Sequence, residues 1–426
     1  MKYPPDLPDF LCGALVQSLL PATLLLTTSK GSALRYMSIP CMVWIASRLV
    51  YPVPGIDTLR LNAVSMLPLM ALQAANLMLI NPLDRENLCA EKPEHTISCF
   101  GRLSYALQVL AQPRGVNTPR QVKNVPPHPA YYIRSGSLTP CRGRFLTRQC
   151  AILAWYYLCL DFLQTVARQQ ATDEGSQSKF SPIEWAVPVD KWIERVITNL
   201  VTWLVVTRII IDTYYRASSI IFVGLRLDSP SNWPPAFGRV ADAYTLRNFW
   251  GKFWHQLLRQ QFTSLSNFIA RDILRLPRPS IQERYTNIFI VFLLSGLLHF
   301  MINYLQAIPL QHSGAMLFFT SMVLGIMFED GIQAVWKRIM APSGVHLPTI
   351  PESASVSPWK RAIGMCWVTA WIGVLSTVYF EPQSQLPKEE TSLVPFSVVE
   401  RLGLRFAVGI LVTSGVILSI VFRTQI

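Results

Sequence analysis

Charged residues are scarce in this chain. Of its 426 residues only 15% are charged and 51% are hydrophobic, whereas an average soluble domain has roughly 25% charged residues. This balance indicates that lipid surrounds most of the chain. No stretch is left over that would form a separate soluble domain.

The sequence also lacks several motifs. Its eight cysteines form no CxxC pair and have no regular spacing with histidine, which argues against a metal site or a disulfide framework. No GxSxG nucleophile motif occurs, so a covalent acyl-enzyme is not expected. The chain has no internal repeat of the kind found in many transporters. The first ten residues make a poor positively charged leader, so we expect the first apolar run to be retained.

Apolar runs recur along the whole length. A helix needs about 20 residues to cross a bilayer, and nine runs meet or approach this length: 10–28, 34–51, 61–80, 150–166, 196–211, 288–308, 315–328, 362–380 and 402–422. We predict an all-α fold, a polytopic membrane protein of about nine transmembrane helices, with residues 1–426 as one domain. Two spans are weaker, because 196–211 contains Arg208 and 315–328 is short.

The distribution of charge predicts the orientation. With the amino terminus in the lumen, the long stretches 81–149 and 212–287 are cytosolic and hold much of the Lys and Arg outside the spans, as the positive-inside rule favours. The stretch 81–149 is rich in Pro, Arg and Ser, and we expect it to be mostly irregular. The net charge of +13 is then explained mainly by membrane topology, and attraction to anionic lipid or to nucleotides remains open as a further contribution. We expect a multi-pass protein of the endoplasmic reticulum that contacts membrane lipid. No nucleic-acid partner is expected, because no recognition module is visible.

Aromatic and basic residues are concentrated in the second long stretch. From residue 246 to 259 the spacing is helical, with Trp250 and Trp254 on a broad apolar face and Lys252 and Arg259 opposite. This pattern predicts an amphipathic helix in the membrane interface. His255 falls at the border of its two faces. It is either a site residue or a histidine that simply reaches towards the lipid surface.

A single histidine stands near the middle of the run 288–308. An ionisable group at membrane depth needs a partner or a wet cavity, so His299 is a candidate site residue. Ser295 and Asn303 lie four residues to either side, on the same helical face. The stripe has two readings, because Ser, Asn and His also join membrane helices by hydrogen bonds. Imidazole, however, is able to take a proton from an alcohol near neutral pH.

Other polar groups near the spans have simpler explanations. Arg208 and Asp212 are spaced to pair along one helix, and Glu329 and Asp330 follow the end of a predicted span. For Asp161 we favour a hydrogen bond between helices.

Three blocks in these stretches resemble a known family. WPPAFG (233–238), LRNFWGKFWHQLLR (246–259) and LLSGLLHF (293–300) are similar, in this order, to blocks of the wax-synthase-like branch of the membrane-bound O-acyltransferases. The resemblance is greatest to fungal members that acetylate terpenoids or meroterpenoids. Together the blocks cover about a tenth of the chain.

The resemblance implies transfer of an acyl group from an acyl-CoA to a hydroxyl of a hydrophobic acceptor, without a bound cofactor or metal. The family's catalytic histidine falls on His299 and its second polar position on His255. His299 would remove the alcohol proton, and His255 would orient the donor or stabilise the oxyanion. The resemblance to the fungal terpenoid members alone implies acetyl as the acyl group. Phe253 replaces a residue that is often basic in plant wax synthases, which argues against long-chain wax ester synthesis.

The remaining expected site residues bind the substrates. The basic side of the predicted helix, with Arg247, Lys252 and Arg259, is suited to the phosphates of coenzyme A, although each charge is equally well explained by topology. The substrate-binding residues expected beside the two histidines are Trp250, Trp254, Ser295 and Asn303.

Three alternatives to this function remain open. They are a long-chain wax ester synthase, a membrane transporter with a midplane histidine, and a scaffold in which His299 only joins helices.

Overall fold

The computed structural model describes residues 7–50, 58–93, 98–132, 140–174, 187–340, 356–386 and 392–422. Within these ranges every regular element is helical. The α-helices are α1 (Leu7–Thr27), α2 (Ala33–Leu49), α3 (Thr58–Ala75), α4 (Arg85–Glu91), α5 (Cys99–Ala111), α6 (Arg142–Glu174), α7 (Val189–Val201), α8 (Arg208–Gly224), α9 (Leu246–Asn248), α10 (Arg259–Asn267), α11 (Ile281–Leu305), α12 (Ala315–Met340), α13 (Pro358–Ser384), α14 (Val399–Leu402) and α15 (Leu404–Phe422).

Short helices of other types extend or connect these elements. The π-helical turns are η1 (Asn76–Ile80), η4 (Thr202–Thr207), η7 (Phe249–Phe253) and η8 (Phe268–Ile273). The 3₁₀ turns are η3 (Ala130–Tyr132), η5 (Pro230–Asn232), η6 (Val240–Asp242) and η9 (Leu310–His312). Because η4 joins α7 to α8 without a break, residues Val189–Gly224 form one rod of 36 residues.

Eight helical segments of the described residues are long and apolar enough to cross a membrane: Pro8–Thr27, Arg60–Ile80, Arg142–Gln169, Val189–Gly224, Ile281–Leu305, Leu310–Ile339, Pro358–Ser384 and Leu404–Phe422. The ninth predicted run, 34–51, corresponds to α2, which is a shorter helix of 17 residues; residue 51 lies outside the described residues. The predicted polytopic helical membrane fold is confirmed.

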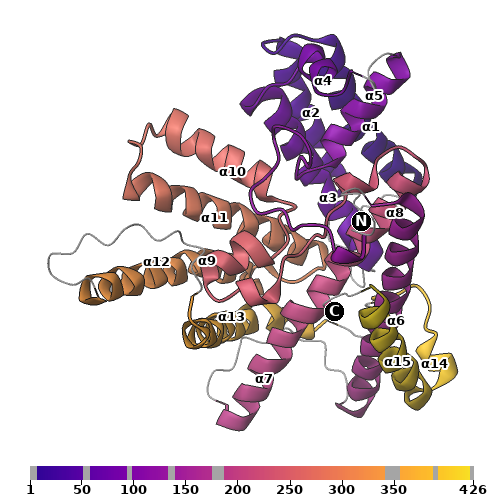
Figure 1. Cartoon of the computed structure of the whole chain (residues 1–426), viewed down its shortest axis with the longest axis vertical. Coiled ribbons are helices and arrows are strands. Elements are labelled where there is room, and N and C mark those ends of the chain that lie inside the picture. The colour runs from indigo at the N-terminus through magenta and orange to yellow at the C-terminus, as the bar shows by residue number, and fades with distance from the viewer. Residues whose placement is uncertain are drawn as a thin grey trace.

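The helices form three groups around the middle of the chain (Figure 1). Helices α1 to α5 lie together at one end, with α1 packed on α5, α2 and α3. Helices α10 to α13 fan out on one side, with extensive packing between α11 and α12, and α7 packs on α13. On the other side α6 packs on both α8 and α15. The short α9 lies centrally, where it contacts α12.

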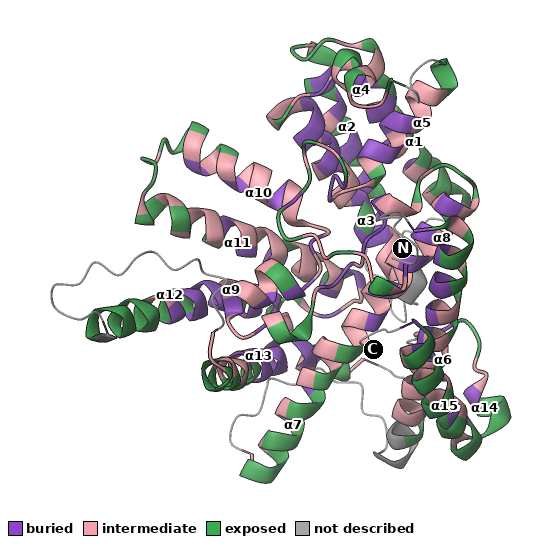
Figure 2. Ribbon diagram, viewed as in Figure 1, coloured by how far each residue is buried: buried purple, intermediate pink, exposed green. Residues whose placement is uncertain are grey.

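Burial is concentrated on the inward faces of the helices, and several outer ends are exposed (Figure 2). Helix α15 has a mean hydropathy of 2.2, yet only 11% of it is buried in the protein. Apolar side chains that face outwards in such numbers are stable in hydrocarbon rather than in water. The exposed surface of α15 is therefore suited to lipid contact.

Two predicted spans lie within candidate membrane spans but have different bounds, and one predicted loop contains more helix than expected. The run 196–211 is the middle of a much longer rod. The run 315–328 does not end at Glu329, because α12 continues to Met340. The stretch 81–149 is not mostly irregular, since it contains α4, α5 and the start of α6.

Of the two carboxylates with an expected partner, Asp212 needs correction and Asp161 does not. Asp212 pairs with Arg216, whose Nε lies 2.8 Å from Oδ2 of Asp212, rather than with Arg208. Arg208 lies over the rings of Phe237 and Phe253 instead. Asp161 accepts hydrogen bonds from the backbone N–H groups of residues 398 and 399 at 2.6 and 2.9 Å, beside the short α14. This joins α6 to α14, as favoured for Asp161.

Candidate active site

The second sequence block does not form the predicted interfacial helix. Its helix starts at α9, where the side chain of Thr245 accepts a hydrogen bond from the N–H of Asn248 at 3.0 Å. It continues through η7 and ends at Trp254, whose φ and ψ of −67° and 152° are extended. The side-chain amide of Gln256 donates to the carbonyls of Trp250 and Trp254 at 2.9 and 2.6 Å, which holds the chain in a turn. His255 lies within this turn.

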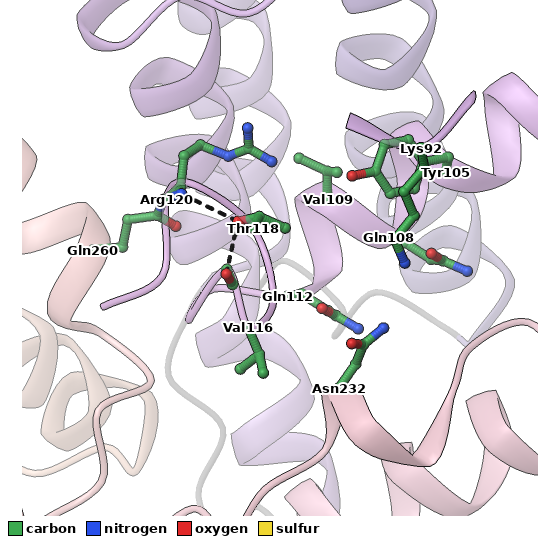
Figure 3. Close-up of a pocket in the computed structure, with 11 residues that line it drawn as sticks. Lys92, Tyr105, Gln108, Val109, Gln112, Val116, Thr118, Arg120, Asn232 and Gln260 are labelled. Carbon is green, nitrogen blue, oxygen red and sulfur yellow. Dashed lines mark hydrogen bonds between the residues drawn. The ribbon is translucent and has the colours of Figure 1, made fainter. Parts of the chain in front are cut away.

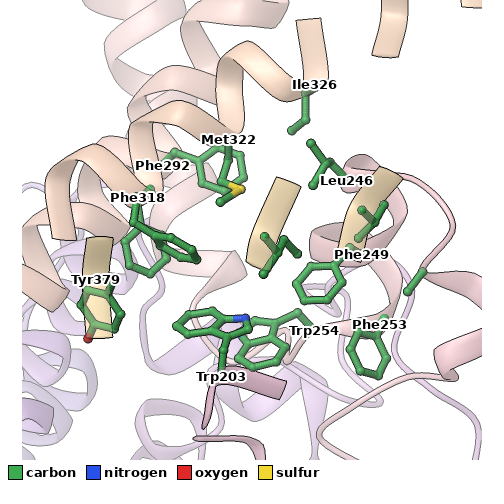
Figure 4. Close-up of a cluster of buried hydrophobic side chains, with 14 of the residues drawn as sticks. Trp203, Leu246, Phe249, Phe253, Trp254, Phe292, Phe318, Met322, Ile326 and Tyr379 are labelled. Atoms are coloured by element: carbon green, nitrogen blue, oxygen red, sulfur yellow. The ribbon is translucent and has the colours of Figure 1, made fainter. Parts of the chain in front are cut away.

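Burial explains why the helix is not interfacial. The apolar side chains of Phe249, Phe253 and Trp254 are each at most 4% exposed. They pack in the largest apolar cluster of the protein, against Trp203 of η4 and side chains of α11 to α13 (Figure 4). The apolar face that the sequence pattern assigned to lipid is therefore covered by protein, and the prediction of an interfacial amphipathic helix was wrong.

Trp254 is clamped between two rings. Trp203 stacks on one side at 4.8 Å between ring centroids and 8° between planes, and Phe249 stacks at 5.5 Å and 18° (Figure 4). Trp203 is 1% exposed. Its role was not predicted, because in the sequence it is one more apolar residue of a span. The clamp fixes the point at which the chain turns into His255.

The first sequence block packs directly on the second. The N–H of Gly238 donates to the carbonyl of Phe253 at 2.8 Å. A Cβ atom on Gly238 would lie 2.0 Å from the carbonyl oxygen of Lys252, so only glycine allows the two backbones to approach this closely. One residue earlier, the ring of Phe237 meets the imidazole of His255 edge to face at 5.8 Å. The blocks therefore form one unit around His255.

A buried arginine supports the first block. Arg114 is 3% exposed and donates to the carbonyls of Pro234 and Pro235, each at 2.7 Å. It also donates to the hydroxyl of Tyr215 and lies over that ring. Arg114 belongs to the stretch predicted as irregular, and no motif or periodicity in the sequence marked it.

His255 is held neutral by its surroundings. Burial is the main cause that lowers its pKa to about 3, and the nearby His299 and Arg114 lower it further. Its Nδ1 is buried and has no hydrogen-bond partner among the described residues. At physiological pH this imidazole is an uncharged ring, with one N–H to donate and one nitrogen to accept.

His299 lies on α11 in the third block, and its orientation is fixed by its own helix. Its Nδ1 is 2.8 Å from the carbonyl oxygen of Ser295, one turn earlier. Since a carbonyl only accepts, Nδ1 carries the hydrogen and Nε2 has a free lone pair. The rings of Phe319 and Tyr379 lie 4.2 and 5.7 Å from the imidazole. His299 is therefore presented as a neutral base with a defined basic nitrogen.

Aromatic rings connect the two histidines. Phe319, which contacts His299, is also 6.0 Å from Trp250. Trp250 is 6.0 Å from Trp254, whose ring is 5.8 Å from His255. Gly296 supports this arrangement, because a Cβ there would lie 3.1 Å from the sulfur of Met316 on α12. The structure thus brings together four expected site residues, Trp250, Trp254, His255 and His299.

Other expected site residues are engaged elsewhere. Asn303 is fully buried and joins helices, since it donates to Ser313 Oγ at 2.9 Å and accepts from Gln383 at 3.1 Å. For Ser295 the contact to the site is its main-chain carbonyl.

The three basic residues do not form one helical face, because the helix ends at Trp254. Arg247 pairs with Asp330 at 2.7 Å. Arg259 donates to the carbonyls of Lys123 and Gly251 and to the side chain of Gln256. Lys252 is exposed.

Glu329 of α12 is the carboxylate that positions this segment. It is 7% exposed and accepts from the N–H of Leu246 at 2.6 Å and from the indole of Trp367 at 2.9 Å. A carboxylate at a helix amino terminus satisfies the free backbone N–H groups there. Glu329 therefore fixes the start of α9 from a distant part of the chain, which sequence pattern alone does not reveal.

A small cavity between α5 and the segments around Asn232 and Gln260 is not lined by either histidine (Figure 3). Its walls come from α5, the segment that follows α5, Asn232 and Gln260. Arg120 in this wall pairs with Glu91. The cavity reaches Asn232, the residue just before the first block.

Comparison with known proteins places these blocks in a wider context. A model of the membrane bound O-acyl transferase family matches residues 233–321, which include all three blocks. Acetyltransferase pyr8 of Aspergillus fumigatus is 39% identical over 93% of this chain and 92% of its own length. Acetyltransferase spyB of the same fungus is 38% identical over 97% of this chain and 70% of its own length. Acetyltransferase TRI7 of Fusarium sporotrichioides is 33% identical, with 94% and 91% coverage. No solved structure matches the chain.

Proposed function

Because the chain belongs to the membrane-bound O-acyltransferase family, and is thus an O-acyltransferase, we propose that it transfers an acetyl group from acetyl-CoA to a hydroxyl of a hydrophobic small molecule, a terpenoid or meroterpenoid of secondary metabolism. Acetyl as the transferred group is supported by the relatives, because proteins named acetyltransferases match this chain over most of its length. The observation that carries the mechanism is the free Nε2 of His299, whose tautomer is set by Ser295.

In this mechanism His299 is the general base. Its Nε2 removes the proton of the acceptor alcohol while the alcohol oxygen attacks the thioester carbonyl of the donor. The tetrahedral intermediate then collapses to the ester, the carbon–sulfur bond breaks, and the thiolate of coenzyme A takes the proton from the imidazolium. The imidazole is again uncharged at the end of the turnover. Because the alcohol attacks the thioester directly, no covalent enzyme intermediate is needed.

His255 is proposed to stabilise the oxyanion. With a pKa of about 3 its ring is a neutral hydrogen-bond donor, and a preorganised donor in a dry site stabilises developing negative charge strongly. The indole N–H of Trp250 is a second candidate donor, since it is buried and has no partner among the described residues. Trp250 and Trp254 also offer apolar surface to the substrates.

The donor is proposed to approach from the side of Lys252, which is exposed. Arg247 and Arg259 contribute indirectly, because their hydrogen bonds hold the segment that carries His255. Ser295 orients His299 through its carbonyl and Asn303 joins α11 to α13, so neither is proposed to contact the substrate.

The proposed membrane is that of the endoplasmic reticulum, with the amino terminus luminal and the stretches 81–149 and 212–287 cytosolic, where acetyl-CoA is available. A glycosylation acceptor sequence inserted at residues 387–391 should be modified, and one at residues 133–139 should not. The measurement is the mobility shift of each protein in microsomes, with and without removal of the glycans. The opposite pattern contradicts the orientation.

The function is tested by a panel of donors. Membranes that contain the protein are supplied with terpenoid alcohols and with acetyl-, butyryl- or palmitoyl-CoA, and products are measured by mass spectrometry. We expect a mass gain of one acetyl group, absent from membranes with His299→Ala and retained with His312→Ala, a histidine outside the site. A preference for palmitoyl-CoA would instead support a wax ester synthase.

A further inference from the structure

A second, smaller cavity lies between α6, α8 and the turn η3. Arg148 and Gln149 of α6 face Asp212 and Arg216 of α8 across it, and Tyr132 of η3 closes one side. None of these residues takes part in the mechanism proposed above. A polar cavity at this position therefore requires its own explanation.

The charges that line this cavity do not balance. Arg148 and Arg216 are 5% and 8% exposed, and Asp212 is 4% exposed. Asp212 is engaged by Arg216, through Nε and Nη2 at 2.8 and 2.7 Å, and accepts from Tyr156 at 3.0 Å. One carboxylate thus faces two guanidinium groups. A buried charge without a partner costs several kcal/mol, so an anion in the cavity would be strongly favoured.

Two hydrogen-bond donors in the wall are unused. The Nε–H of Arg148 and the hydroxyl of Tyr132 are buried and have no hydrogen-bond partner among the described residues. Tyr132 is 4% exposed, and the guanidinium of Arg148 lies 5.6 Å from the centre of its ring. Buried donors are normally paired. These two flank the same cavity and point to a ligand that accepts hydrogen bonds.

The cavity shares a wall with the active site. Trp233 and Pro235 of the first block line it, and Phe237 of the same block contacts His255. Arg114 holds the carbonyl of Pro235 at 2.7 Å. The cavity and His255 thus contact the same segment, the first block (233–238).

We propose that this cavity is a binding site for a phosphate group. Guanidinium groups bind phosphate with paired, charge-assisted hydrogen bonds, and two of them, with a single carboxylate, line this cavity. The chemistry of the lining therefore suits an anionic group of a larger ligand. The coenzyme A part of the donor is one source, which rests on the function proposed above, and a phospholipid headgroup carries the same chemistry.

The test compares Arg148→Gln with Arg144→Gln. Arg144 lies one turn earlier on α6 and is exposed. The substitution Arg144→Gln therefore removes the same charge from a position outside the cavity. Binding of coenzyme A, of dephospho-coenzyme A and of phosphatidic acid in mixed micelles is measured on the purified full-length protein, by calorimetry and by thermal unfolding. We expect Arg148→Gln to raise the dissociation constant of the phosphate ligand at least about tenfold, the effect of losing one charge-assisted hydrogen bond. Arg144→Gln should leave it unchanged.

Stability without ligand provides a second readout. If the charge of Arg148 lacks a partner, Arg148→Gln should raise the Tm of the ligand-free protein and reduce the Tm gain on adding ligand. A purely structural arginine would show a lower Tm and an unchanged gain, which would overturn the proposal. Tyr132→Phe removes a single hydroxyl and should weaken binding about threefold without unfolding the protein.

The outcomes separate the cavity from the proposed function. Loss of coenzyme A binding identifies the donor as the source of the phosphate, and loss of phosphatidic acid binding alone identifies lipid. Equal binding of all ligands by wild type and Arg148→Gln overturns the cavity proposal, whether or not the wild type transfers acetyl. If the wild type fails to transfer acetyl but Arg148→Gln still loses a phosphate ligand, the cavity proposal stands and the proposed function fails.

Discussion

The two histidines are held by different kinds of structure. His299 belongs to α11, a continuous helix of 25 residues, and its Nδ1 is hydrogen-bonded to the carbonyl one turn earlier. His255 lies in an irregular turn, where the rings of Phe237 and Trp254 flank it and Nδ1 has no partner among the described residues. A hydrogen-bonded imidazole has a fixed tautomer, whereas a ring held by packing does not. His299 is therefore suited to one proton transfer, and His255 to hydrogen bonding with a ligand.

The largest expected effect is that of His299→Ala. Loss of a general base typically lowers the rate about 10²- to 10⁴-fold, and the free Nε2 of this residue has no substitute on α11. We expect this loss per unit of folded protein, measured as labelled product from acetyl-CoA after size exclusion in detergent. His299→Asn should be equally inactive. Activity within about tenfold of the parent would show that His299 only joins helices.

The effect of His255→Ala should be smaller, about 10²-fold, at the lower end for an oxyanion donor. His255→Asn keeps an N–H donor and should recover part of the loss, because the proposed role needs a hydrogen bond rather than a proton transfer. Both variants are assayed for kcat and KM on purified protein. If either variant loses more activity than His299→Ala, the roles of the two histidines are reversed.

Gly238→Ala tests the junction that places His255. Its Cβ would meet the main-chain oxygen of Lys252 at 2.0 Å, where no side chain is able to move away. We expect a loss of stability of about 1–3 kcal/mol, as for overpacked cores, and a lower kcat from displacement of His255. Gly251→Ala is the matched control, because a Cβ there has open space around it. Both are measured by thermal unfolding and by acetyl transfer, and equal behaviour of the two would contradict the role of Gly238.

The contrast between the histidines also explains what the sequence could predict. The long helices and the position of His299 follow from hydropathy and helical spacing, which are local properties. The segment that carries His255 was predicted to be an interfacial helix. In the structure its apolar face is covered by Trp203, which stacks on Trp254 and lies 51 positions before it in the sequence. Glu329 and Arg114, which fix the start of α9 and the first block, also act over long separations in the chain. The spacing of apolar and polar residues along the chain does not reveal such long-range contacts. The resemblance to the family did indicate that the three blocks belong to one site.

The smallest expected effect concerns pH and follows from the burial of His255. Its pKa is lowered in the folded protein to about 3, from the ordinary value of 6.5, so between these values the unfolded state binds more protons. The free energy of unfolding is therefore not reduced by His255 above pH 6.5, and it decreases as the pH falls from 6.5 towards 3.

Between pH 7.5 and pH 5 we expect His255 to account for a loss of up to about 2 kcal/mol. The comparison is the Tm of wild type and of His255→Asn at the two pH values, in the same detergent. The drop in Tm should be smaller in His255→Asn than in wild type, whereas His312→Asn, a histidine outside the site, should leave the drop unchanged. Equal drops in wild type and His255→Asn would mean that His255 is solvated enough to take up a proton in the folded protein. His255 would then carry a positive charge in acid, and the proposed role of its ring as a neutral donor would be confined to higher pH.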